Sequence, residues 1–92
     1  MIKSFKHKGL ARYFEKNDRR GIDAKQCSRI RRILDALDQA TSPGELNVPG
    51  WRFHQLTGDR MGTWSVSVSG NWRITFDFSG ADAVNVNLED YH

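Results

Sequence analysis

The sequence predicts a single α+β domain, spanning residues 1–92, in which two N-terminal helices pack on an antiparallel sheet. Three observations lead to this fold class. Between Leu10 and Leu37, apolar residues recur every three or four positions, as on one face of a helix. From Trp51 onward, apolar and polar residues alternate, as in half-buried strands. A chain of 92 residues is long enough for one hydrophobic core and too short for two.

The N-terminal part is expected to form a short strand over residues 2–6, followed by a first helix. Leu10, Tyr13 and Phe14 fall at helical spacing before Gly21 interrupts the pattern. These three side chains should therefore face the core from one side of the first helix.

The second helix has clearer signals at both ends. Asp23 is expected to cap it with Gln26 at the third helical position, and Ile22 can pack against Cys27 across that cap. Its apolar stripe is formed by Cys27, Ile30, Ile33, Leu34 and Leu37. The segment TSPG, residues 41–44, should end it. The opposite face carries Lys25, Arg29, Arg32 and Asp35, a pattern that fits a solvated surface or one that contacts RNA.

The C-terminal half is predicted to be an antiparallel meander with one apolar face and one polar face. Trp64, Val66 and Val68 alternate with serines, and a second run alternates in the same way from Trp72 to Phe78. The segment 69–71, Ser-Gly-Asn, predicts a tight hairpin between them, and Ser79-Gly80 begins the turn into Val84, Val86 and Leu88. The helices should cover the apolar face.

Composition limits the classes of function. Fourteen Lys and Arg against eleven Asp and Glu give a net charge of +3, which favours a polyanionic partner without identifying one. Cys27 is the single cysteine, so neither an internal disulfide nor a thiolate cluster is expected. Histidine spacing and the lack of a glycine-rich phosphate loop predict no metal and no cofactor. No signal peptide or membrane span is apparent, so a cytoplasmic protein is expected.

Strand alternation places several reactive side chains on the polar face. His54 points away from Trp51 and Phe53, and Arg73 points away from its apolar neighbours, so both should share that face. Continuing the alternation places Tyr91 there as well. Asp90 and His92 have the parity of the core face, although they lie beyond the last apolar residue of the strand.

These residue types meet the needs of RNA cleavage without a metal. An imidazole transfers protons near neutral pH, a guanidinium holds a phosphate through two hydrogen bonds, and a tyrosine ring stacks on an unpaired base. In such a reaction a 2'-hydroxyl attacks the adjacent phosphate while a base and an acid move protons and arginine stabilises the phosphorane.

Residues 56–76, LTGDRMGTWSVSVSGNWRITF, resemble the signature of the HigB-type toxins in the RelE/ParE superfamily. That signature has a Leu-x-Gly-x-Arg-x-Gly element, two paired strands and a turn that carries Asn, Trp and Arg. The opening MIKSFKHKGL and the closing EDYH are also similar to that family, as is the order of helices and strands over essentially the whole chain.

The resemblance implies the toxin of a type II toxin-antitoxin module with a compact RelE-like fold. It implies a metal-independent endoribonuclease that cuts mRNA in the A site of the 70S ribosome and inhibits translation. The implied partner is a HigA-type helix-turn-helix antitoxin, through which the toxin reaches operator DNA. No membrane is involved in this interpretation.

The resemblance also assigns roles to residues. The implied catalytic residues are His54, Arg73, Asp90, Tyr91 and His92, and Asn71 beside Arg73 is expected to bind substrate. Thr57 stands where some relatives carry Lys, so Arg73 would act alone on the phosphate or with help from Arg60 or Arg52. For ribosome contact we expect four basic residues: Lys6, Lys8, Arg29 and Arg32.

Two other classes of function remain open at this stage. ParE-like toxins of the same superfamily inhibit DNA gyrase by binding and cleave no RNA, so fold alone does not decide the chemistry. A module that binds nucleic acid without cutting it is the second alternative. His54, Arg73 and the terminal Asp-Tyr-His favour the nuclease, because a binder does not need acid-base groups on one face.

Overall fold

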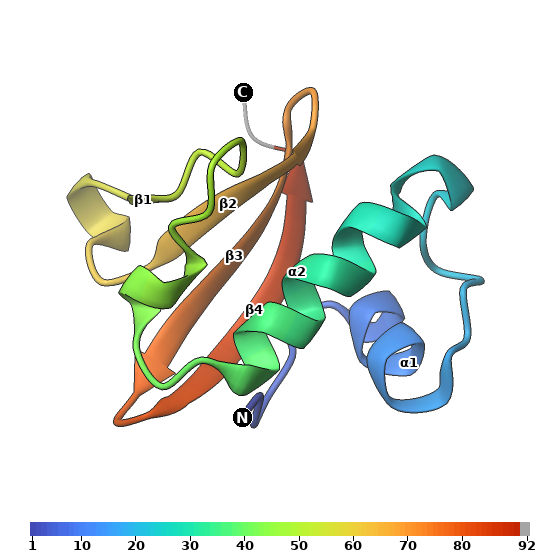
Figure 1. The fold of residues 1–92 in the computed structure, drawn as a ribbon, viewed down its shortest axis with the longest axis horizontal. Coiled ribbons are helices and arrows are strands. Elements are labelled where there is room, and N and C mark those ends of the chain that lie inside the picture. The colour runs from blue at the N-terminus through green and yellow to red at the C-terminus, as the bar shows by residue number, and fades with distance from the viewer. Residues whose placement is uncertain (91–92) are drawn as a thin grey trace.

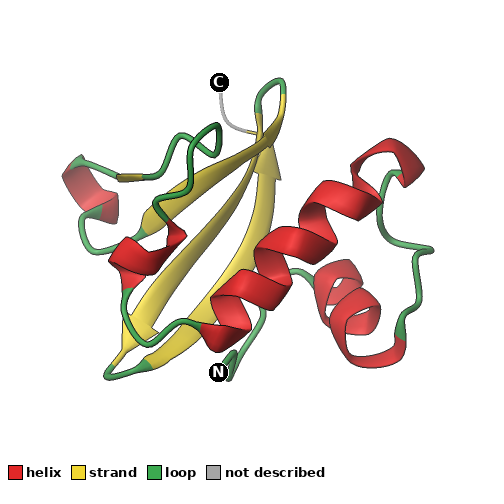
Figure 2. Ribbon diagram, in the orientation of Figure 1, coloured by secondary structure: helices red, strands yellow, loops and turns green. Residues whose placement is uncertain are grey.

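The computed structural model describes residues 1–90, which form two α-helices and a four-stranded antiparallel sheet (Figures 1 and 2). The helices are α1 (Lys8–Lys16) and α2 (Cys27–Gln39). The strands are β1 (His54–Gln55), β2 (Trp64–Ser69), β3 (Trp72–Ser79) and β4 (Asp82–Asp90), and they lie side by side in that order. The α+β prediction is therefore confirmed.

Three short 3₁₀ turns connect these elements. They are η1 (Ala24–Gln26), η2 (Pro43–Leu46) and η3 (Gly58–Arg60). The segment GDRMG, residues 58–62, includes η3 and links β1 to β2. No helix within residues 1–90 is long and apolar enough to cross a membrane.

The core lies between α2 and one face of the sheet, with α1 beside α2 (Figure 1). The predicted stripe on α2 is buried, with Ile30, Ile33, Leu34 and Leu37 all 0% exposed. Ile74 and Phe76 on β3 are also 0% exposed and meet it from the sheet. Burying each such side chain contributes about 1.5–3 kcal/mol relative to leaving it in water.

The first helix begins and ends with side-chain and backbone caps. The His7 Nδ1 accepts a hydrogen bond of 3.1 Å from the Leu10 backbone amide. The helix ends at Asn17, whose left-handed backbone (φ 55°) brings its amide to the carbonyls of the last turn. The backbone then passes close to the start of α1 at Gly21. A Cβ on Gly21 would lie only 2.8 Å from the Cα of Gly9.

The start of the second helix differs from the prediction. Asp23 caps the turn η1 rather than α2, accepting from the Lys25 amide at 2.9 Å. The Gln26 side chain does not close a capping box but donates to the Ser69 Oγ at 2.9 Å. A long-range hydrogen bond to the sheet has thus replaced the local one, and α2 begins only at Cys27.

The prediction of a strand over residues 2–6 is wrong, because no regular strand forms there. The segment nevertheless bonds to the sheet. Two isolated parallel bridges join Ile2 to Ala83 and Phe5 to Val86. The Lys3 and Lys6 amides donate to the Ala83 and Val86 carbonyls, each at 2.8 Å. Residues 2–6 are therefore hydrogen-bonded along the outer edge of β4, the last strand of the sheet.

The first strand is shorter than the alternation from Trp51 predicts. Arg52 has a positive φ of 51°, which breaks the extended backbone before β1. Trp51 is nevertheless buried, and Phe53 stacks on Trp64 with ring centroids 5.0 Å apart. The apolar residues thus occupy the core face as expected even where the strand does not form.

The two later hairpins agree with the predicted turns. Gly70 and Gly80 adopt φ values of 55° and 61°, which glycine tolerates at no steric cost. The ladders shift register between Ser67 and Ser69 and again between Thr75 and Asp77. These irregularities bend the strands and increase their twist.

Candidate functional site

The register of the sheet places His54 and Arg73 on the same face, opposite the helices. Directly opposed residues of antiparallel strands share a face. His54 pairs with Ser65, which pairs with Thr75, while Arg73 pairs with Ser67 on one side and Glu89 on the other. His54 and Arg73 are separated by two inter-strand spacings across the sheet and by two residues along the strands, so their Cα atoms are about 12 Å apart.

His54 is exposed at the outer strand of this face. Its Nδ1 lies 2.9 Å from the Arg52 carbonyl oxygen, and a carbonyl only accepts hydrogen bonds. The ring nitrogen Nδ1 must therefore carry the proton of this contact. In the neutral ring the lone pair is then on Nε2, which suits a general base.

An ion pair that was not predicted covers the centre of the polar face. Arg60 donates to both carboxylate oxygens of Glu89, at 2.8 and 2.6 Å. The Thr75 hydroxyl donates to the same carboxylate. Thr75 is 2% exposed and its neighbour Ser65 is 0% exposed. The polar face of the sheet is thus buried at its centre.

Glu89 is held in its ionised form. Its pKa falls to about 2, chiefly because of the hydrogen bonds from Arg60 and also because of the bond from Thr75, while burial opposes this shift. A carboxyl with so low a pKa cannot supply a proton near neutral pH. Its negative charge lies on the strand next to Arg73 and anchors Arg60 on the same face.

The remaining expected residues that the structure describes lie near the β2–β3 hairpin and the end of β4. Asn71 is exposed in the β2–β3 hairpin directly after Gly70. Asp90 is exposed at the end of β4 and pairs with Trp72, so its Cβ points to the helix side, in agreement with its parity. Arg73, near the start of β3, is half-buried. Tyr91 and His92 lie outside the described residues.

The four expected ribosome contacts do not gather around His54. Lys6 and Lys8 are exposed next to the edge of β4, and Arg32 is exposed on α2. Arg29 is half-buried and donates to the carbonyls of Gly50 and Ser67, at 2.9 and 3.4 Å. Arg29 thus fastens α2 to the sheet, which the helical spacing alone did not predict.

Sequence reasoning missed Glu89, although a signal was present. Glu89 has the same strand parity as Asn85 and Asn87, so alternation places it on the face of Arg73. Its contact with Arg60 spans 29 residues, and no local pattern predicts that pairing. Within residues 1–90, no group of three His, Cys, Asp or Glu side chains could hold a metal ion.

Two helices on one face of a four-stranded antiparallel sheet make up a RelE-like fold. The family model described as the RelE-like toxin HigB of type II toxin-antitoxin systems matches residues 3–92. The chain therefore belongs to the HigB-like toxin family, and this membership implies an antitoxin partner.

Two curated relatives support this assignment. The chain is 53% identical over 92 residues to the "Endoribonuclease HigB" of Proteus vulgaris, and the alignment covers 100% of both chains. It is 31% identical over 93 residues to "Toxin HigB-1" of Vibrio cholerae serotype O1, covering 99% of this chain and 98% of the relative.

Proposed function

We propose that this protein is an endoribonuclease that cuts mRNA in the A site of the ribosome and thereby stops translation. The observation that carries the proposal is the end-to-end identity of 53% to a protein named as an endoribonuclease. The exposed His54 and the arginines on the same face fit that activity, because they supply a proton acceptor and phosphate-binding groups.

The reaction we propose needs no metal. His54, through Nε2, removes the proton from the ribose 2'-hydroxyl, whose oxygen then attacks the adjacent phosphorus. Arg73 donates two hydrogen bonds to the phosphorane oxygens as negative charge accumulates there. The bond to the 5'-oxygen breaks, that oxygen takes a proton from an acid, and a 2',3'-cyclic phosphate remains.

The proposal draws the acid from the end of the chain. Asp90 and His92 are the candidates for proton transfer to the leaving oxygen, and Tyr91 is the candidate for stacking on a base. Asn71 lies in the hairpin beside Arg73, and we assign it to substrate binding. Arg60 is bound to Glu89, so we assign it an indirect part, as a support for the face on which the substrate lies.

The proposed partners follow from this activity. The 70S ribosome with bound mRNA is the substrate complex, and a HigA-type helix-turn-helix antitoxin neutralises the toxin and brings it to operator DNA. A cytoplasmic location is part of the same proposal, because ribosomes and operator DNA are found there. Exposed Lys6, Lys8 and Arg32 would contact ribosomal RNA, and such contacts weaken as salt rises.

The decisive experiment is primer extension on a defined mRNA, with and without programmed ribosomes. We expect position-specific cuts only when ribosomes are present, and their loss when His92 is removed. A 2'-deoxynucleotide at the cut position should abolish the cut, because it lacks the attacking oxygen. No cut in either reaction, together with inhibition of DNA gyrase by the same protein, would favour the ParE-like alternative.

Two substitutions test the assigned roles. His54→Ala should lower the cleavage rate by about 10²–10⁴ if His54 is the base. The matched control is Gln55→Ala, at an exposed neighbour whose side chain points to the other face, and it should cleave like the parent. Arg73→Lys keeps the charge but not the two parallel hydrogen bonds, so a large loss distinguishes phosphorane binding from simple charge attraction.

A further inference from the structure

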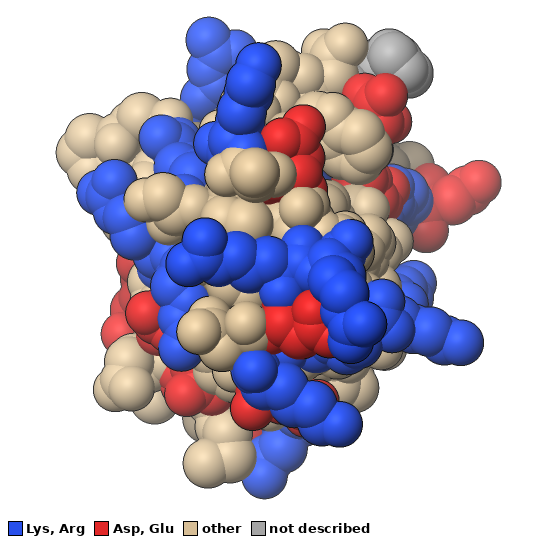
Figure 3. Space-filling model, turned by 90° about the vertical axis from the view of Figure 1, so that its right-hand side faces the viewer, with Lys and Arg blue, Asp and Glu red and all other residues tan. Residues whose placement is uncertain are grey.

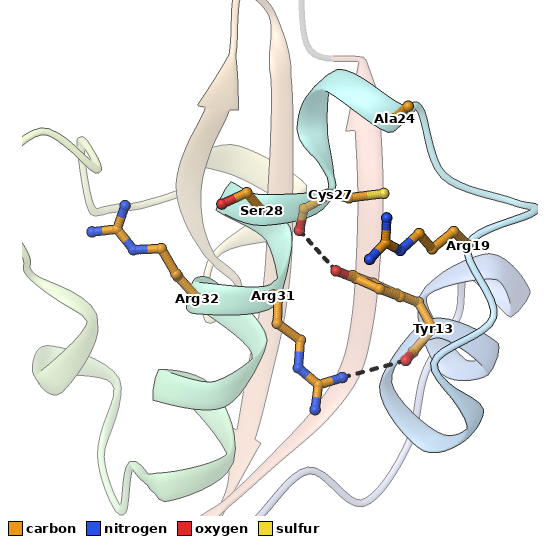
Figure 4. Close-up of a pocket in the computed structure, with 7 residues that line it drawn as sticks. All are labelled: Tyr13, Arg19, Ala24, Cys27, Ser28, Arg31 and Arg32. Carbon is orange, nitrogen blue, oxygen red and sulfur yellow. Dashed lines mark hydrogen bonds between the residues drawn. The ribbon is translucent and has the colours of Figure 1, made fainter.

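A groove of about 430 Å³ lies between α1 and α2, on the helix side of the sheet. Its floor is formed by Tyr13 and Cys27, and Arg19, Arg31 and Arg32 line it together with Ser28. Figure 4 shows Arg19 and Arg31 on the two sides of Tyr13. None of the described residues proposed for cleavage lines this groove, and Arg32 is the one expected ribosome contact that does.

Hydrogen bonds and charge contacts hold the side chains that form the groove. The Tyr13 hydroxyl donates to the Cys27 carbonyl oxygen at 3.1 Å, which joins α1 to α2. Four groups hold Arg31. Its guanidinium lies 5.6 Å from the Phe14 ring centre and 5.8 Å from the Tyr13 ring centre. Its Nη1 donates to the Tyr13 carbonyl at 3.4 Å, and its Nε lies 3.3 Å from Asp35. A preorganised guanidinium loses less entropy when a ligand binds.

Basic side chains extend beyond the groove itself. Arg12 and Arg20 line a second hollow of about 310 Å³. Figure 3 shows the side of the molecule that carries α1, where Lys and Arg side chains cover much of the surface. This side therefore presents a positive potential to any partner.

The pattern of charge favours a protein partner over a nucleic acid. Carboxylates are interspersed among the arginines: Asp18 binds Arg20 at 2.8 Å and Asp35 binds Arg31. A phosphate backbone is matched by a continuous positive stripe, because every phosphate carries negative charge. A protein surface with acidic residues and a few basic or apolar ones matches a mixed pattern with a net positive charge.

We propose that this α1–α2 groove is the docking site for an acidic, amphipathic segment of the antitoxin. Carboxylates of that segment accept hydrogen bonds from Arg19, Arg31 and Arg32, and an apolar side chain rests on the Tyr13–Cys27 floor. The type II family to which the chain belongs supplies the partner, so the proposal does not depend on the nuclease activity.

The test measures by calorimetry the affinity of the purified antitoxin of this module for the full toxin chain. The double variant Arg19→Glu, Arg32→Glu reverses two exposed charges of the groove. We expect its affinity to fall at least tenfold, with a weaker dependence on salt than the parent shows. The matched control reverses the exposed Lys3 and Lys6 at the edge of β4 and should bind like the parent.

A second variant tests the shape of the groove rather than its charge. Ser28→Trp fills the groove from an exposed position and leaves every arginine in place. It should also weaken the antitoxin complex at least tenfold, and thermal melting of each free variant shows that the domain remains folded.

Affinities of both groove variants within twofold of the parent would overturn the proposal. An equal loss in the Lys3 and Lys6 control would also overturn it, since any charge would then matter. If the groove variants keep the antitoxin but no longer sediment with ribosomes, the groove contacts RNA and the proposal is wrong. If the parent protein does not cleave mRNA but the groove variants still lose affinity for the antitoxin, only the proposed nuclease activity is refuted.

Discussion

The two faces of the sheet are both buried at their centres, but by different means. On the helix side Val66, Ile74 and Phe76 are 0% exposed and packed against α2 and its neighbours. On the other side Ser65 and Thr75 are 0% and 2% exposed beneath the pair formed by Arg60 and Glu89. The helix side is stabilised by close packing and the other side by charged hydrogen bonds. Removing a buried ring should therefore destabilise the first, and breaking the ion pair or lowering the pH should destabilise the second.

The largest expected effect comes from removing volume on the apolar face. Phe76→Ala deletes a ring that is 0% exposed and leaves a cavity, which should lower the free energy of unfolding by about 3–5 kcal/mol. Urea unfolding followed by circular dichroism measures this loss. Trp72→Ala on the same strand is the control, because its 39% exposure predicts a smaller cost. Equal losses would show that packing does not distinguish these positions.

The next effect comes from breaking the ion pair on the polar face. Arg60→Met keeps the apolar stem but leaves Glu89 without that partner, which should cost about 1–2 kcal/mol because both groups remain partly exposed. Adding Glu89→Gln should recover part of the loss. A double-mutant cycle of unfolding midpoints measures the coupling. Simple additivity would mean that the pair contributes nothing to the face.

Acid should weaken the same pair without any substitution. The pKa of Glu89 is about 2 when folded, below the value of about 4.3 in an unfolded chain. The unfolded state therefore binds the proton first, and stability falls as pH drops from about 5 towards 2. After solvent screening the loss due to Glu89 should be about 1 kcal/mol. Glu89→Gln should remove that part of the pH dependence, and an unchanged profile would refute it.

The smallest expected effect is a pH-dependent loss of stability on the helix side, at the His7 cap of α1. Burial and then the charge of Arg12 lower the pKa of His7 below 6.5. The unfolded chain again takes the proton first, so the contribution of the His7 cap is complete above pH 6.5 and declines below it. His7→Asn keeps a capping oxygen and should match the parent within about 0.5 kcal/mol at pH 7.5.

The same variant should lose the decline in stability that protonation of His7 causes below pH 6.5. Comparing the unfolding midpoints of parent and variant at several pH values measures this difference. Parallel curves would show that another group causes the decline.

Alternation along the strands was sufficient to predict most of the sheet. Ile74 and Phe76 fell on the core face and Arg73 on the other, as their positions required. The helical stripe on α2 was predicted for the same reason, since the period of three to four residues fixes the buried side. Patterns of this kind follow from local backbone geometry, which the sequence carries directly.

Pairings between distant residues could not be predicted in this way. Gln26 binds Ser69 across 43 residues, and Arg60 binds Glu89 across 29. Whether a polar side chain caps its own helix or reaches the sheet depends on the packed arrangement and not on its neighbours in sequence. Of the candidate site, the shared face of His54 and Arg73 was therefore predictable, whereas the burial of Thr75 and the anchoring of Arg60 were not.

The parallel bridges from Ile2 and Phe5 to β4 impose an order on biosynthesis. These contacts join the beginning of the chain to residues 83 and 86, so they cannot form while the protein is only partly translated. Each nascent chain must hold its N-terminal segment unattached until the last strand has been made. Contacts so distant in sequence are also slow to close, so a newly made toxin molecule acquires its complete sheet late.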